Sequence, residues 1–270
     1  MPAIYPSSAW REFRGKPNLK TLNDGAIHFA IVKDVHGKDR KCAVKLINLK
    51  KGPGLACEAI GWLLAGACGV NVPAFACILR VPLAKLGLSM TLPDFVKGES
   101  EYLAWCVEIV EGKAISQVNK WIFWLALKNC LAAKNTPVIA SFDYWADNAD
   151  RNFGNVIKSK DGQYVAIDHE ALLHDLLYKP RGITFKLNSL LQCAQQDLSS
   201  KKLLRFKCDM ATAASLHANA QSSVSADILI FLTRLLPDAS QAAYVASVID
   251  GYLKPRAQLG WMSQELGVTI

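Results

Sequence analysis

The stretch from 141 to 170 constrains the fold most, because it places carboxylates and amides at short intervals among large aromatic and aliphatic residues. It reads SFDYWADNADRNFGNVIKSKDGQYVAIDHE. A solvated charged run does not need the aromatic residues, and an ordinary core segment does not tolerate the carboxylates. The pattern therefore indicates polar groups that an apolar scaffold holds in place around a ligand.

The first part of this stretch predicts a helix over 137–147. Thr136 suits the N-cap position and Pro137 suits the first helical position. The apolar residues that follow recur at helical spacing, so one face of this helix is expected to be buried.

A hairpin is predicted at 155–168, because Asp161-Gly162 is a strong signal for a two-residue turn. Counting back from this turn places Asn155 opposite Asp168. Residues that face each other across two strands have Cβ atoms about 5 Å apart. The register therefore predicts that Asn155 and Asp168 hold one Mg²⁺, since this ion prefers carboxylate and carbonyl oxygen ligands.

Asp150 precedes Asn155 by five residues, in the loop expected between the helix and the hairpin. Protein kinases have the same Asp-x-x-x-x-Asn spacing in their catalytic loop, where the Asp accepts the hydroxyl proton and the Asn holds a metal ion, as does a later Asp. The spacing alone is a weak signal, and the helix before it and the hairpin after it make it more specific. The open alternative is that Asp150 and Asn152 cap a turn and that Asp168 caps the next helix.

A second pair of charged residues lies in the N-terminal third. Residues 26–48 read as a β-hairpin, and Lys45 falls in the middle of its second strand, on the face opposite to Val44 and Leu46. Glu58 is the only acidic residue between 51 and 93 and sits in an apolar helix, where an unpaired carboxylate is costly. A Lys45–Glu58 ion pair satisfies both, and kinases use such a pair to orient the nucleotide phosphates. The alternative is a Glu58 at the exposed edge of its helix and a Lys45 that reaches solvent.

On these residues the chain resembles the HipA-like kinases, a bacterial branch of the protein-kinase-like fold that is distantly similar to phosphatidylinositol kinases. The resemblance is carried by SFDYWADNADRNFGN and VAIDHE, with support from AVKLI and ACEAIGWLLAGACGVNVP, within 40–175. It implies an α+β, two-lobed kinase. A small strand-rich N-lobe would cover 1–95 and a larger helical C-lobe would cover 96–270.

The resemblance also implies a function. ATP and Mg²⁺ would be the cofactors, and the γ-phosphoryl group would pass to a hydroxyl, with a protein Ser or Thr as the expected acceptor, in a toxin–antitoxin setting. Asp150 takes the catalytic-base position, Asn155 and Asp168 the metal positions, Lys45 the phosphate contact and Glu58 its partner. Two alternatives stay open, a non-catalytic kinase-shaped (pseudokinase) binding module and a small-molecule phosphotransferase.

The chain departs from the family pattern at several points. Asn152 stands where the family most often has His, which leaves open how the loop is braced. Asp168 is followed by His169-Glu170 rather than by Phe-Gly. No G-x-G-x-x-G loop is present, so backbone amides in 21–27 or 51–54 are the candidates for covering the phosphates.

Composition narrows the class of partner. The chain has 270 residues and a formal charge of +8, but its basic residues are spread out, which argues against nucleic acid and fits an anionic ligand such as a nucleotide. The eight cysteines form no C-x-x-C pair, which indicates reduced, buried thiols. The N-terminus lacks a signal-peptide run, and the longest apolar stretch is too short for a bilayer, so a cytoplasmic protein without a membrane partner is expected.

The remaining segments predict mainly helix, and in LACEAIGWLLAGACG at 55–69 Gly69 is expected to end the helix. Residues 87–100 read as a connection between two lobes, and the pattern becomes helical from 101 onward. The stretch VNKWIFWLALKNCLAA at 118–133 predicts a long and largely buried helix, and ADILIFLTRLL and QAAYVASVIDGYL predict two more. The last part of the chain, after 175, carries no motif that bears on chemistry.

Overall fold

The computed structural model describes residues 2–17, 26–178 and 189–269. The chain divides into two compact units. We call Pro2–Ala59 with Pro73–Ile109 the sheet unit, and Ile60–Val72 with Val110–Ile270 the helical unit. One unit is rich in strands and the other in helices, which confirms the α+β expectation.

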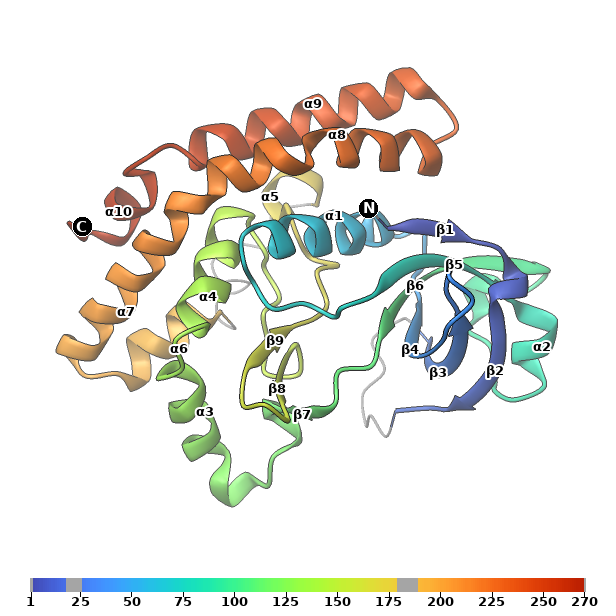
Figure 1. The fold of residues 1–270 in the computed structure, drawn as a ribbon, viewed down its shortest axis with the longest axis horizontal. Helices are drawn as coiled ribbons and strands as arrows, with labels where there is room; N and C mark the ends of the chain where they lie inside the picture. The colour runs from blue at the N-terminus through green and yellow to red at the C-terminus, as the bar shows by residue number, and fades with distance from the viewer. Residues whose placement is uncertain (1, 18–25, 179–188, 270) are drawn as a thin grey trace. The chain divides into compact units, whose positions relative to one another are not determined.

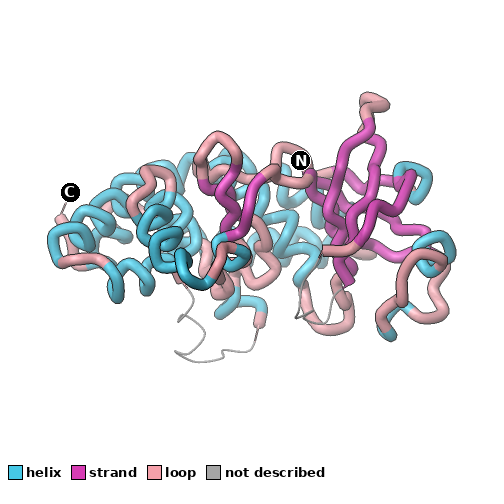
Figure 2. Tube along the Cα trace, turned by 90° about the horizontal axis from the view of Figure 1, so that it is seen from below, coloured by secondary structure: helices cyan, strands magenta, loops and turns pink. Residues whose placement is uncertain are grey.

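The sheet unit is built on a six-stranded sheet with the order β1-β5-β6-β4-β3-β2, drawn in magenta in Figure 2. Only the β1–β5 pair is parallel among its described pairs. β3 and β4 form the hairpin predicted at 26–48. The elements of this unit are β1 (Ala3–Tyr5), β2 (Trp10–Gly15), β3 (Ala26–Lys33), β4 (Asp39–Leu46), β5 (Ala76–Pro82), the short helix α2 (Leu83–Gly87) and β6 (Glu101–Glu108).

Strand β4 shows the alternation that its sequence predicts. Cys42, Val44 and Leu46 are fully buried in the hydrophobic core of the sheet unit. Lys45 lies on the opposite face of the strand and is half-buried, because successive side chains of a strand point to opposite sides.

The division of the chain differs from the predicted boundary between 95 and 96. Residues from 101 form strand β6 rather than helix, and β6 pairs with both β4 and β5. Residues 87–100 therefore return the chain to the same sheet and do not connect two lobes. Conversely, Ile60–Val72 belongs to the helical unit. The boundary depends on strand pairing between residues far apart in the chain, and local sequence patterns do not predict such pairing.

The helical unit contains most of the helices and a three-stranded sheet with the order β7-β8-β9. Figure 1 shows α8 and α9 running side by side. Among the described residues, no helix combines the length and the apolar character that crossing a bilayer requires. The elements are β7 (Gly112–Ala114), α3 (Phe123–Leu131), α4 (Thr136–Trp145), β8 (Val156–Ser159), β9 (Tyr164–Ala166), α5 (His174–Leu177), α6 (Leu190–Asp197), α7 (Ser200–Ala213), α8 (His217–Leu235), α9 (Ala239–Arg256) and α10 (Trp261–Leu266).

Helix α1 spans Gly54–Ala67, and the division between the units runs through it. It ends as its sequence predicts. Gly69 takes a left-handed conformation with φ of +75°, and the amide of Val70 donates to the carbonyl of Ala65 over 2.9 Å. Glycine adopts this conformation without steric cost, which makes it the usual residue at the end of a helix.

Helix α4 begins one residue before the predicted start. Asn135 occupies the N-cap position, and Thr136 is the first helical residue. The hydroxyl of Thr136 does not cap the helix but donates to the carbonyl of Cys130 over 2.6 Å. The predicted apolar face is confirmed, since Phe142 and Trp145 are fully buried.

The hairpin after α4 exists, but its predicted register is wrong by one residue. Lys158 pairs with Tyr164, and the amide of Ser159 donates to the carbonyl of Gln163 over 2.9 Å. The turn therefore has three residues, with Gly162 at φ of +83°, the arrangement of a turn followed by a left-handed bulge residue. As a result Asn155 does not lie opposite Asp168.

Helix α3 is shorter and more exposed than predicted. It covers nine residues, Phe123–Leu131, rather than the whole of 118–133. Its buried side is formed by Leu127, Cys130 and Leu131. Large apolar residues at its start remain exposed to solvent. Packing within the helical unit therefore does not explain why these positions are apolar.

Candidate functional site

The loop that follows α4 is anchored by a buried ion pair. Arg151 is 0% exposed, and its guanidinium donates from Nε and Nη2 to the Asp143 carboxylate on α4, at 2.9 Å for each of the two closest contacts. Asn148 Nδ2 also donates to Asp143 Oδ1 over 2.8 Å. A planar guanidinium held on both carboxylate oxygens is a strong and directional contact. Arg151 therefore braces the loop, as does Asp143.

The same guanidinium ties the loop to the hairpin. Nη1 of Arg151 donates to the carbonyl of Asn155 over 3.1 Å and also to the carbonyl of Ile167. The amide of Ile167 in turn donates to the Asn155 carbonyl over 3.1 Å. Ile167 directly precedes Asp168, so one buried cation holds together the backbone next to both predicted metal ligands.

Asp150 lies within this loop and is oriented by its neighbours. Its Oδ1 accepts a hydrogen bond from Asn152 Nδ2 over 3.0 Å. Asn152 Oδ1 accepts from the amide of Gly154 over 2.7 Å, and Asn155 Nδ2 donates to the Asp150 carbonyl over 2.8 Å. Asn152 therefore braces the loop through its own side chain. The contact with the Gly154 amide is an Asx turn, in which an Asn side chain accepts a hydrogen bond from the backbone amide two residues later. An Asn two residues before a Gly is the signal for it in the sequence.

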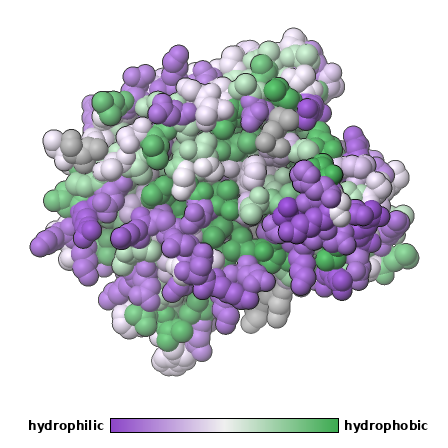
Figure 3. Space-filling view, viewed as in Figure 1, coloured by the Kyte–Doolittle hydropathy of each residue, from purple (hydrophilic) through white to green (hydrophobic). Residues whose placement is uncertain are grey.

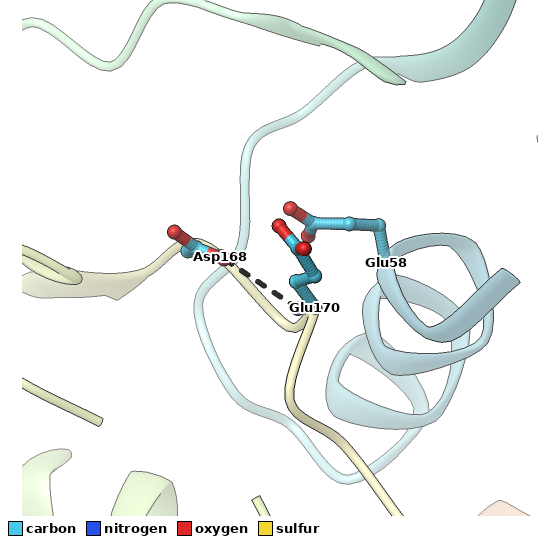
Figure 4. Close-up of side chains that lie close together, drawn as sticks. All are labelled: Glu58, Asp168 and Glu170. Atoms are coloured by element: carbon cyan, nitrogen blue, oxygen red, sulfur yellow. Dashed lines mark hydrogen bonds between the residues drawn. The ribbon is translucent and has the colours of Figure 1, made fainter. Parts of the chain in front are cut away.

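Asp168 lies two residues after the end of β9 and has a left-handed backbone with φ of +62°. Its carboxylate accepts from the amide of Glu170 at 3.5 Å, as Figure 4 shows. Carboxylate oxygens of Asp168 and Glu170 lie within 4.8 Å of each other. A left-handed backbone carries a steric cost for a residue other than glycine, and residues held in this way cluster at functional sites.

A second strained residue lies at the end of α4. Asp147 has φ of +52° and is buried. Its Oδ2 accepts from the amide of Asp175 over 2.7 Å and from the hydroxyl of Tyr252 on α9 over 3.1 Å. Burial and the nearby Asp147 charge raise the pKa of Tyr252 well above its ordinary value of 10.0, so the phenol stays protonated and donates. In this way α9 supports the turn that leads into the Asp150 loop.

The predicted Lys45–Glu58 pair is present in the sheet unit. Lys45 Nζ lies 3.1 Å from Glu58 Oε1. The Glu58 side chain is 1% exposed and that of Lys45 is 18% exposed, so this pair is not a solvated surface contact. The alternative in which Glu58 is exposed is therefore wrong, and the prediction of a Lys45–Glu58 ion pair is confirmed.

The donor set near the hairpin fits a magnesium ion. Asn155 uses its amide nitrogen on the Asp150 carbonyl, which leaves its side-chain oxygen as an acceptor. Asp168 and Glu170 add carboxylate oxygens on neighbouring residues. Mg²⁺ takes oxygen ligands of these types and usually retains several waters. The strand register from which Asn155 and Asp168 were predicted to share an ion is wrong, so their role as metal ligands stays a prediction. Glu170 is an additional candidate ligand that the sequence did not lead us to name, although it stands only two residues after Asp168.

The loop expected to cover the phosphates cannot be assigned, because residues 21–25 lie outside the part of the chain that the structure describes. Residues 51–53 are described and form an irregular bend before α1, which begins at Gly54. No protein-family model matches the chain, and no curated protein matches it in sequence. The functional interpretation therefore depends on the arrangement of the residues.

Proposed function

We propose that this chain is an ATP-dependent, HipA-like kinase that transfers the γ-phosphoryl group to a hydroxyl, with a protein Ser or Thr as the expected acceptor. One observation carries the proposal. The buried Arg151 binds the backbone carbonyls of Asn155 and Ile167, which holds the Asp150 loop against the strand end that bears Asp168. Such rigid positioning of a base and metal ligands is what phosphoryl transfer requires of a protein.

Asp150 would accept the proton of the attacking hydroxyl. Asn152 occupies Oδ1 of this carboxylate, and no described residue donates a hydrogen bond to Oδ2. The hydrogen bond on Oδ1 fixes the orientation of the carboxylate, and Oδ2 is left to accept the hydroxyl proton of the acceptor. The carboxylate is half-buried, so an acceptor can approach it.

Asn155 and Asp168 would hold Mg²⁺, with Glu170 as a further oxygen ligand. The ion, when bound, would neutralise charge on the phosphates. Lys45 would contact nucleotide phosphates, and the nearly buried Glu58 would hold the lysine side chain in place. In this proposal, each unit of the chain contributes charged residues to the reaction.

Two measurements test this function. Thermal unfolding is followed with and without Mg-ATP, and transfer of labelled γ-phosphate is followed to the chain itself, to Ser/Thr peptides and to water. We expect Mg-ATP to raise the Tm of the wild type, by an amount equivalent to about 2.7 kcal/mol at a hundredfold excess over Kd. Asp168→Ala is expected to lose this shift, because it removes a metal ligand.

Asp150→Asn separates catalysis from binding. We expect it to keep the Tm shift and to lose transfer by about a hundredfold or more, the usual contribution of a general base. Asp209→Asn, an exposed position on α7, is the matched control and should behave as wild type. Equal labelling by wild type and Asp150→Asn would refute the role of Asp150. A Tm shift without any transfer would instead support the non-catalytic binding module.

A further inference from the structure

The helical unit has a concave surface that is lined by none of the residues of the proposed kinase function. A cavity of about 480 Å³ lies between α3 and the strands β7 and β8. Its lining is mainly apolar, with Ile115, Val118, Leu125 and Tyr164 among the contributing residues. Lysines from β7, β8 and the turn after β8 complete the lining. We call this surface the α3 groove.

Two of these lysines are placed against each other. Lys113 on β7 and Lys158 on β8 are direct partners in the antiparallel register, and both are exposed. Like charges directly opposite each other destabilise a strand pair, since their Cβ atoms are about 5 Å apart. Among the described residues neither lysine forms an ion pair. The neighbouring acid Glu111 already pairs with Lys160 over 2.6 Å. An anionic group between Lys113 and Lys158 would remove this repulsion.

The side of the groove formed by α3 carries exposed apolar side chains. Ile122, just before α3, and Leu125 on α3 line the cavity and are exposed, and beside them Trp121 is 88% exposed and Trp124 is exposed as well. Figure 3 shows hydrophobic residues at the surface toward the lower end of the view, where Figure 1 places α3. Large apolar groups that gather beside a cavity, rather than being scattered singly, mark a binding surface.

We propose that the α3 groove binds an acidic segment of a partner protein that carries large apolar side chains. Carboxylates of the segment would lie between Lys113 and Lys158, and its apolar residues would fill the cavity beside Leu125. A concave cavity suits inserted side chains better than a flat lipid surface. A second copy of this chain is disfavoured as the occupant, because each copy carries a formal charge of +8. This inference concerns binding and is independent of phosphoryl transfer.

The test uses a short, fluorescently labelled peptide in which Leu and Trp alternate with Asp and Glu. Two control peptides replace either the acids by Lys or the apolar residues by Ser. We expect fluorescence anisotropy to show the full-length chain binding the first peptide roughly tenfold or more tightly than either control. Equal binding of all three peptides, or none, would overturn the proposal.

Protein variants locate the binding surface. Lys113→Glu with Lys158→Glu should weaken binding of the acidic peptide roughly tenfold or more and should bind the Lys peptide in its place. Lys201→Glu with Lys202→Glu, exposed on α7, makes the same change in net charge and should leave binding unchanged. Leu125→Ser should weaken binding, whereas Leu229→Ser, exposed on α8, should not. Circular dichroism confirms that each variant is folded.

Other occupants give distinct results. Binding to phosphatidylserine vesicles that depends on Lys113 and Lys158, without peptide binding, would overturn the proposal in favour of a membrane contact. Self-association in size-exclusion chromatography that Leu125→Ser abolishes would overturn it in favour of a second copy. Loss of peptide binding in both the groove variants and the α7 control would show that only net charge matters, which would also refute it.

Discussion

Arg151 is the residue on which the candidate site depends most at the scale of single side chains. It is completely buried and satisfies its donors with the Asp143 carboxylate and with two backbone carbonyls. A buried charge is tolerated only with such complete pairing, because removal from water costs several kcal/mol. The residue therefore has little freedom, and its loss would affect both the loop and the hairpin.

Replacing Arg151 tests this dependence. Arg151→Met leaves the Asp143 carboxylate buried without its cation, so we expect the free energy of unfolding to fall by about 3–5 kcal/mol in urea denaturation. Arg205→Met is the control, because Arg205 and Asp209 lie 3.9 Å apart on the exposed side of α7. This change should cost less than about 1 kcal/mol. Similar losses in both variants would contradict a special role for Arg151.

Gly61 shows a second constraint at the residue scale. A Cβ atom at this position would lie 2.3 Å from the Cβ of His169, the residue between Asp168 and Glu170. His169 is itself buried and packs edge-on against Phe142, with ring centroids 5.8 Å apart. Neither side of this contact can retreat easily, so the absence of a side chain at 61 allows the close approach.

A pair of glycine variants on α1 measures this effect. Gly61→Ala should lower the free energy of unfolding by about 1–3 kcal/mol, because the added methyl group overpacks the contact with His169. Gly66→Ala meets only Val72, at 3.8 Å, and should be stabilising by up to about 1 kcal/mol, since alanine favours a helix more than glycine does. Equal changes in Tm for the two variants would show that the His169 contact is not tight.

At the scale of elements, the packing of α4 against α7 and α8 encloses a histidine. His217 is 1% exposed and stacks on Trp145, with ring centroids 4.5 Å apart. Its Nε2 lies 3.5 Å from the Ser141 hydroxyl, and its Nδ1 has no hydrogen-bond partner among the described residues. Burial lowers the pKa of His217 to about 4 from its ordinary value of 6.5. The imidazole is therefore neutral in the folded chain.

This pKa has a consequence for stability. Below pH 6.5 the unfolded chain binds a proton at His217 that the folded chain binds only near pH 4, so protonation favours unfolding. The stability that neutral His217 contributes is fully present above pH 6.5. It is lost as the pH falls toward 4, with a slope of up to about 1.4 kcal/mol per pH unit. We expect His217→Phe, which keeps an aromatic ring beside Trp145, to show a smaller loss of stability between pH 7 and 5.

Urea denaturation at several pH values checks this expectation. The wild type should also lose stability through His28, whose pKa burial lowers to about 4. The His217→Phe profile should therefore be less steep than that of the wild type but not flat. Identical slopes for the two proteins would mean that His217 is not buried as a neutral side chain.

At the scale of the whole molecule, the proposed function requires residues from both units. Lys45 and Glu58 belong to the sheet unit, and Asp150, Asn155 and Asp168 belong to the helical unit. A variant in the sheet unit therefore tests the proposed function independently of the Asp150 loop. Lys45 on β4 is the most suitable residue to replace, because an exposed lysine on the same strand provides a matched control.

Lys45→Met is therefore compared with Lys41→Met. Both lysines point to the same face of β4, but Lys41 is exposed, whereas Lys45 binds Glu58. We expect Lys45→Met to lower the rate of γ-phosphate transfer by about a hundredfold, the size typical of one lost electrostatic contact to the reacting group. Lys41→Met should retain the wild-type rate. A Lys45→Met variant with full activity would exclude this lysine from the nucleotide site.

Local patterns in the sequence by themselves determined several parts of the protein. The alternation in β4 predicted which face carries Lys45, and the single acid in an apolar helix predicted the pair with Glu58. Gly69 predicted the end of α1, and the apolar spacing in α4 predicted its buried face. These features were predictable because the physical cause lies within a few residues of the chain.

Only the tertiary structure decided the rest. Pairing of β6 with β4 and β5 moved the unit boundary from 95 to 109, and a three-residue turn at Gly162 shifted the register at Asn155. The apolar start of α3 remained exposed although its sequence resembles a buried helix. Each outcome depends on which distant segment packs against a residue, and that free energy belongs to the assembled chain rather than to any short stretch of it.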